Sequence, residues 1–181
     1  ALLAPEVRNS GVVVARMGTV ALAAGEEFEL QFDNNDALSN VRVSPSTLRA
    51  WVENSHAVQA PGGLILLSAQ AADALQSGVI NNTGTLAANT LTQKDGVIRL
   101  QASQAIIQTG TVQASAIQAE TKNLIDAGTW DASAASNGSA QGGNISIAAS
   151  AHIEQTAAGL LKADGDAQAS GGSIRVTSSG D

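Results

Sequence analysis

The chain has no cysteine and no tyrosine among its 181 residues, and aromatic residues make up only 2% of it. The absence of cysteine excludes disulfide staples, thiol catalysis and cysteine-ligated metal centres. With so few aromatic side chains, the core has to be built from alanine, valine, isoleucine and leucine, which suit thin stacked layers. This composition is untypical of helix bundles and of enzymes with deep pockets.

Basic residues are also scarce, since nine Lys and Arg against sixteen Asp and Glu give a formal net charge of −7. They stand singly, which excludes the basic patch that nucleic acid or an anionic membrane surface requires. No apolar run approaches the ~20 residues of a membrane span, and no signal-peptide pattern is present. Because the chain opens in mid-pattern without an initiator Met, we expect a segment of a longer protein.

Glycine introduces short apolar patterns at regular places along the chain. Gly-x-(Val/Ile)-x-(Leu/Ile/Val) occurs five times, at 18–22, 63–67, 96–100, 143–147 and 172–176. A second pattern, Gly-x-(apolar)-x-Ala, occurs five times, at 11–15, 84–88, 110–114, 128–132 and 159–163. The two alternate after Gly18 except between Gly96 and Gly143, where Ala-Ile-Gln-Ala at 116–119 supplies the missing member without its glycine. A pattern that restarts in this way is typical of repeat architectures.

Within each pattern, apolar residues alternate with polar or small ones, which predicts strands. A third apolar element precedes the second pattern, at Val7, Ile107, Ile125 and Ile153. Three strands and three corners make one turn of a triangular coil, and the eighteen residues from Val112 to Trp130 are about enough for one turn. The sequence therefore predicts an all-β fold, a right-handed parallel β-helix of about five rungs stacked roughly 4.8 Å apart.

We expect one β-helix segment over 1–181, with an insertion at 26–60 and regular rungs over 61–181. The insertion begins with alternating residues at 27–32 and 40–43 on either side of Asp-Asn-Asn-Asp, which predicts a β-hairpin packed against the side of the rod.

Two short helices are also expected. Ser44 as N-cap and Pro45 at the first helical position predict a helix that ends the insertion, with Leu48, Trp51 and Val52 on its apolar face. A further helical turn or two is expected between Ser68 and Gly78. The Ser-, Ala- and Gly-rich stretch at 133–143 predicts a loop that swells at a corner.

The first half of the chain resembles a known family in several short sequence motifs. Residues 1–30, ALLAPEVRNSGVVVARMGTVALAAGEEFEL, and the stretch 39–88 contain phrases of the types LLAP-x-V-x-N-x-G, G-x-V-x-LAAG and GG-x-(I/V)-x-L. In these phrases the chain is similar to filamentous haemagglutinin-like exoproteins of two-partner secretion, in the segment after the secretion domain. Residues 92–181 share only general β-helix repeat chemistry with that family. The resemblance implies a large secreted or cell-surface bacterial protein, exported through a partner outer-membrane transporter.

Oxygen-bearing side chains gather most densely at Asp33, Asn34, Asn35 and Asp36. Carboxylate and amide oxygens are calcium ligands, so Asp33 and Asp36 are the candidate metal ligands and Asn34 and Asn35 candidate ligand-binding residues. A hairpin turn explains the same residues equally well.

The two tryptophans have different expected roles. Trp130 occupies the inward position of its strand and is expected in the core, whereas Trp51 is expected to anchor the insertion. A sugar-stacking platform is the alternative for Trp51, which makes it a further candidate ligand-binding residue.

Other polar residues give no catalytic or metal site. His56 and His152 lie 96 residues apart with no metal-ligand spacing around either. Two carboxylate pairs flank glycine corners, where Asp is favoured for turn geometry alone. They are Asp126 with Asp131 and Asp164 with Asp166.

We therefore expect no enzyme and no cofactor, but a structural rod segment of a secreted or surface-exposed adhesin for attachment to cells, surfaces or matrix, including biofilm. Its expected partners are the transporter during export and a host or matrix glycan or protein. A carbohydrate-binding or carbohydrate-cleaving β-helix is the alternative.

Overall fold

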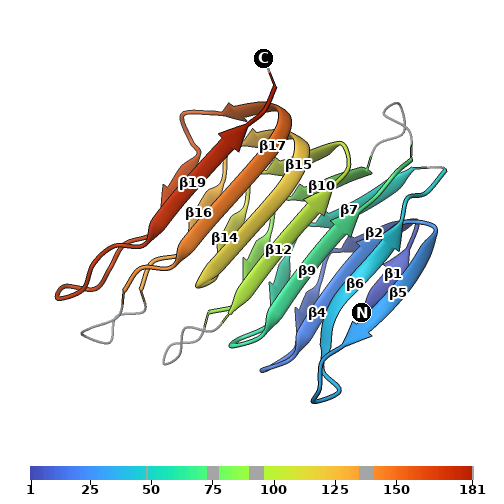
Figure 1. The fold of residues 1–181 in the computed structure, drawn as a ribbon, viewed down its shortest axis with the longest axis horizontal. Coiled ribbons are helices and arrows are strands. Elements are labelled where there is room, and N and C mark those ends of the chain that lie inside the picture. The colour runs from blue at the N-terminus through green and yellow to red at the C-terminus, as the bar shows by residue number, and fades with distance from the viewer. Residues whose placement is uncertain (48, 73–77, 90–95, 135–140, 181) are drawn as a thin grey trace.

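Parallel β-sheets make up most of the protein in the computed structural model, which describes residues 1–47, 49–72, 78–89, 96–134 and 141–180. The strands form an 11-stranded sheet, a 6-stranded sheet and a 2-stranded sheet. All pairings in the two larger sheets are parallel, and the chain advances from one end of the stack to the other (Figure 1). The expectation of an all-β fold with parallel strands is confirmed. The described residues contain no helix long and apolar enough to cross a membrane.

The first glycine pattern, its member without a glycine and the opening residues of the chain form neighbouring strands of the 11-stranded sheet. In order of pairing they are β1 (Leu2–Ala4), β4 (Thr19–Ala24), β9 (Leu64–Ala69), β12 (Val97–Ala102), β15 (Ala116–Asp126), β17 (Asn144–Gln155) and β19 (Ser173–Ser178). The register aligns Val20, Ile65, Ile98, Ile117 and Ile145, all buried, in one column. The pattern member without a glycine, at 116–119, is the start of β15, as predicted.

The third apolar element forms the remaining strands of the same sheet. They are β2 (Glu6–Asn9), β7 (Ala50–Asn54), β10 (Gly78–Asn82), β13 (Ala105–Gln108) and the second halves of β15 and β17. In β13 and β15 the inward residues are the neighbours of Ile107 and Ile125, by which the element was recognised. Ile106 and Leu124 are buried, and Ile125 is 40% exposed.

The second glycine pattern forms the 6-stranded sheet. Its strands are β3 (Val12–Val14), β8 (Ala57–Gln59), β11 (Thr85–Ala87), β14 (Thr111–Gln113), β16 (Thr129–Asp131) and β18 (Leu160–Lys162). A Cβ on Gly110 would collide with the carbonyl oxygen of Gly84, and one on Gly84 with that of His56. Stacked corners therefore leave no room for a side chain at these positions.

We call the stretch of chain between a strand and its next parallel neighbour one circuit.

The core is one continuous apolar cluster enclosed by the two parallel sheets. It consists of alanine, valine, leucine and isoleucine with one large side chain, Trp130, which is fully buried as predicted. In register, Trp130 stacks between Val112 and Leu161. Small residues fill the interior of each circuit at the close spacing of adjacent strands.

The predicted hairpin is confirmed, and the helix predicted after it is wrong. The antiparallel pair consists of β5 (Glu27–Phe32) and β6 (Leu38–Ser44). Beyond it the chain stays extended, because Ser46 pairs in parallel with Ala71 and β7 pairs with both β2 and β10. Parallel pairing on both sides of β7 overrides the local helix signals. Leu48, the first residue of the expected helical face, lies outside the described residues.

The other expected helix lies only partly within the described chain. Ser68 belongs to strand β9 and so caps no helix there, and Gly78 begins β10. Residues 73–77 between them lie outside the described residues, as do 135–140 of the corner loop expected at 133–143.

The hairpin packs on the outer surface of the first strands of the 11-stranded sheet. Val41 is buried against Ala21, Ala23 and Leu66, which point outward from β4 and β9. Under the hairpin, β4 and β9 are therefore buried on both faces. Beyond it, β12 and β15 alternate between buried and exposed residues, as strands covered on one face do.

Candidate functional site

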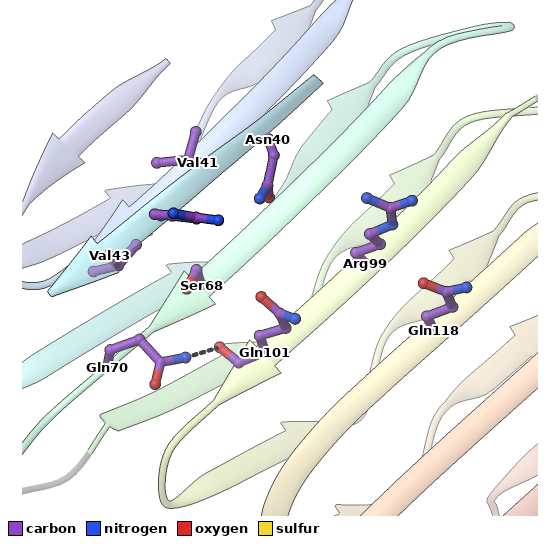
Figure 2. Close-up of a pocket in the computed structure, with 9 residues that line it drawn as sticks. Asn40, Val41, Val43, Ser68, Gln70, Arg99, Gln101 and Gln118 are labelled. Atoms are coloured by element: carbon purple, nitrogen blue, oxygen red, sulfur yellow. Dashed lines mark hydrogen bonds between the residues drawn. The ribbon is translucent and has the colours of Figure 1, made fainter. Parts of the chain in front are cut away.

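A hollow of the described surface lies beside the hairpin (Figure 2). It has a volume of about 460 Å³. One wall is four consecutive residues of β6, and the floor comes from β9, β12 and β15 together with Gln70 just after β9. The lining residues are Asn40, Val41, Arg42, Val43, Ser68, Gln70, Arg99, Gln101 and Gln118.

A second hollow of about 270 Å³ continues along the same side of the hairpin. Ala37, Leu38 and Ser39 line it from the hairpin, and Arg99 lines both hollows. We call the two together the hairpin trough. Neither hollow is lined by a residue of β5, so the trough runs along the side of β6 that faces away from β5.

Arg99 stands at the middle of the trough floor, between Leu66 of β9 and Gln118 of β15 in register. Its Nε is buried and has no hydrogen-bond partner in the described structure. Arg8 and Arg42, in contrast, each lie within ion-pair distance of a glutamate. In a chain with net charge −7, the guanidinium of Arg99 thus has no ion-pair partner among the described residues, although its Nε is itself too buried for a ligand to reach.

Among the described strands, the edge of β6 that borders the trough has no strand partner. β6 pairs with β5 alone, whereas the strands beneath it are paired within the large sheet. One carbonyl of β6, that of Leu38, is already occupied, since it accepts a hydrogen bond from Oγ1 of Thr19. Unpaired main-chain N–H and C=O groups along a strand edge form a template for another strand.

A second polar feature lies inside the protein, where side-chain amides stack from circuit to circuit. Asn9 donates from Nδ2 to Oδ1 of Asn54, Asn54 to Oδ1 of Asn82, and Asn82 to Oε1 of Gln108, each at 2.8 Å. We call these four residues the amide ladder. All four are buried, so these bonds satisfy amide groups that water does not reach, whereas Nε2 of Gln108, at the end of the ladder, has no hydrogen-bond partner in the described structure.

Asp126 occupies the next register position after the amide ladder and is 1% exposed. Its Oδ1 accepts hydrogen bonds from the indole Nε1 of Trp130 at 3.0 Å and from the backbone N–H of Gly128 at 3.1 Å. Burial raises the pKa of Asp126, and hydrogen bonds from Trp130, Gly128 and Gln155 oppose that rise. Asp126 is therefore a structural carboxylate of the interior and not half of an outward pair with Asp131.

The raised pKa of Asp126 predicts a specific pH dependence of stability. A carboxyl whose pKa is higher folded than unfolded contributes stability that is fully present below its ordinary pKa of about 4. That contribution is lost as the pH rises through the folded-state pKa. The free energy of unfolding of wild type, taken relative to that of Asp126→Asn, should therefore be larger below pH ~4 than at neutral pH. Urea unfolding of both proteins at a series of pH values from acid to neutral measures this difference in free energy.

Asp131→Asn is the matched control, because Asp131 lies on the outward side of β16, where it accepts a hydrogen bond from the N–H of Ser133. A stability difference between wild type and Asp126→Asn that stays constant with pH would contradict the assignment.

The residues proposed from the sequence for metal or ligand binding lie at the hairpin turn. Oδ1 of Asp33 accepts the backbone N–H groups of Asn35 at 2.8 Å and Ala37 at 3.0 Å, and Asp36 adopts a φ of 58°. Asn34, Asn35 and Asp36 are exposed. These contacts match the turn explanation of the motif, and only Asp33 reaches the hairpin trough.

Trp51 lies on β7 and not on a helix. The guanidinium of Arg49 covers its ring, 4.4 Å from the centroid, and its Nε1 lies 3.4 Å from Oε2 of Glu53. One ring face is thus occupied by a cation–π contact.

The remaining candidates are dispersed. His56 and His152 are both exposed, one at the turn between β7 and β8 and one on β17. Asp164 and Asp166 flank the corner between β18 and β19. Within the described ranges, no group of three or more His, Cys, Asp or Glu side chains is placed to hold a metal ion.

Searches with this chain find no matching protein-family model and no matching curated protein.

Proposed function

We propose that the chain is a structural rod segment of a large secreted or surface-exposed bacterial adhesin, built as a right-handed parallel β-helix. The observation that carries this proposal is the constant register of successive circuits. Equivalent residues stack in columns, so each circuit contacts mainly its neighbours and rod length follows the number of circuits. The six strands of the smaller sheet support about six rungs, against the five counted from glycine patterns. Right-handedness follows from the strong preference of parallel crossovers for that hand.

The resemblance of residues 1–91 to filamentous haemagglutinin-like exoproteins supports the adhesin assignment and export through a partner outer-membrane transporter. In this proposal the rod carries attachment sites away from the bacterial surface, and surface features such as the hairpin trough contact host cells, matrix or biofilm components.

The proposal is tested in the bacterium that makes the protein. Antibodies raised against the chain should label the outer surface of intact cells or the culture medium, and in-frame deletion of residues 1–181 should reduce attachment to host cells or matrix several-fold. Deletion of 98–116 is the matched control. It removes one circuit of 19 residues and joins positions in the same register, because Ile98 pairs with Ile117. Antigen confined to the cytoplasm, or undiminished attachment after the full deletion, would refute the adhesin role.

A carbohydrate-binding or carbohydrate-cleaving module is the second candidate, and the polar groups that line the hairpin trough are the observation behind it. Amide and guanidinium groups from Asn40, Gln101, Gln118 and Arg99 converge there, as in polar sugar sites. Release of reducing ends from a panel of polysaccharides would establish cleavage, and binding without release would establish the module alone.

A further inference from the structure

The hairpin trough combines a free strand edge with an unpaired guanidinium. We propose that it binds an extended peptide, which adds as a strand to the free edge of β6 and places one carboxylate side chain on Arg99. Peptide binding of this kind is a property of the chain itself and does not depend on the proposed role as a rod segment.

The shape of the trough fits an extended chain. Both hollows lie end to end along β6, whose seven residues span about 23 Å at the rise of ~3.3 Å per residue in a strand. The wall offers the main-chain groups of β6 that β5 leaves unpaired, apart from the Leu38 carbonyl, which accepts a hydrogen bond from Thr19. Strand addition to such an edge gives a peptide main-chain hydrogen bonds, and pockets for alternate side chains give selectivity.

The floor supplies those alternate positions. Val97, Arg99 and Gln101 point outward from β12 at intervals of two residues. Val97 lines the hollow at the Leu38 end of β6, Gln101 lines the hollow beside Val41 and Val43, and Arg99 lines both. A peptide that lies over this floor therefore passes Val97, Arg99 and Gln101 in turn. Every second residue of a complementary peptide is then apolar, acidic and polar, in that order.

Arg99 favours a carboxylate over a neutral group. No carboxylate among the described residues lies within ion-pair distance of its guanidinium, and because its Nε is buried, a ligand meets the guanidinium through its terminal Nη groups. A carboxylate satisfies the guanidinium with charge-assisted hydrogen bonds, the strongest available to it. The trough lining contains no aromatic residue, so a sugar ring would find no stacking surface there. The lining therefore favours an acidic peptide over an acidic glycan.

The test selects peptides on the purified 181-residue chain from a displayed library of random heptapeptides. Enriched sequences should lack proline, alternate in side-chain character and carry Asp or Glu at a fixed position. The best peptide, made synthetically with a fluorophore, should bind Arg99→Gln about tenfold or more weakly than wild type.

Arg175→Gln is the matched control and should bind like wild type. Arg175 stands in the same outward column as Arg99, through Gln118 and Ser146, but three strands farther along the sheet and outside the trough. Circular dichroism and melting temperature establish that both variants are folded.

Three results would overturn the inference. The first is a library without enrichment over a blank surface, and the second is equal binding to wild type and Arg99→Gln. The third is an N-methylated peptide that binds as well as its parent, since N-methylation removes the donors that strand addition needs. If no peptide binds, but an acidic oligosaccharide such as oligogalacturonate binds wild type and not Arg99→Gln, the trough is a glycan site instead.

Discussion

Val112→Asp should abolish cooperative folding of the chain. Val112 is fully buried on β14, between Leu86 and Trp130 of the neighbouring circuits. A carboxylate there has no partner and no access to water, which costs about 3–5 kcal/mol for an uncompensated buried charge. That is a large part of the total stability of about 5–15 kcal/mol typical of a domain. Urea unfolding followed by circular dichroism should show loss of the transition or a midpoint far below wild type.

Thr111→Asp is the control for this substitution, since the neighbouring position on β14 points away from the core. It should change stability by no more than about 0.5 kcal/mol, as surface substitutions usually do. If Val112→Asp unfolds at the same urea concentration as Thr111→Asp, the inward assignment of the second glycine pattern is wrong.

Asn82→Ala should destabilise the protein by about 2–6 kcal/mol. The substitution removes the acceptor of Asn54 Nδ2 and the donor to Gln108 Oε1, both in fully buried residues. Each buried polar group left without a partner costs about 1–3 kcal/mol. Equilibrium urea unfolding gives the difference directly.

Asn81→Ala is the matched control, because the adjacent asparagine of β10 points outward. Combining Asn82→Ala with Asn54→Ala gives a further check. The double variant should lose less stability than the sum of the single variants, since residues joined by one hydrogen bond are coupled. Additive losses would show that the amide ladder does not act as a connected chain.

Much of the fold could be predicted because the repeats fix both the strands and their phase. The glycine patterns located strands such as β12 and β14, and alternation at 27–32 located the hairpin. Strand β8 was missed because it has no introducing glycine, and β7 was taken for a helix because its pairing partners are remote in sequence.

The position of the hairpin also has a signal in the sequence. Val-Ala-Leu-Ala-Ala at 20–24 and Leu-Ile-Leu-Leu at 64–67 are continuous apolar runs, whereas the corresponding residues at 97–102 alternate. A strand that is apolar on both faces must be covered on both. The contrast identifies the strands beneath the hairpin.

The hairpin trough could not be predicted from local motifs. Its residues come from β6, β9, β12 and β15, which only the register of the folded circuits brings together. The amide ladder, in contrast, does leave a trace. A polar residue stands two positions before the corner glycine at Asn9, Asn82, Gln108 and Asp126, a recurrence visible only when the polar positions of the repeats are aligned.

Because the register of the circuits is constant, features on the surface of the molecule are spaced along its axis in multiples of one strand spacing. Gain or loss of one whole circuit by duplication or deletion would move the hairpin relative to any feature beyond that circuit by a single step of ~4.8 Å along the axis. The side of the molecule on which each feature faces would be kept. Distances between surface features can therefore evolve in fixed increments, without redesign of the features themselves.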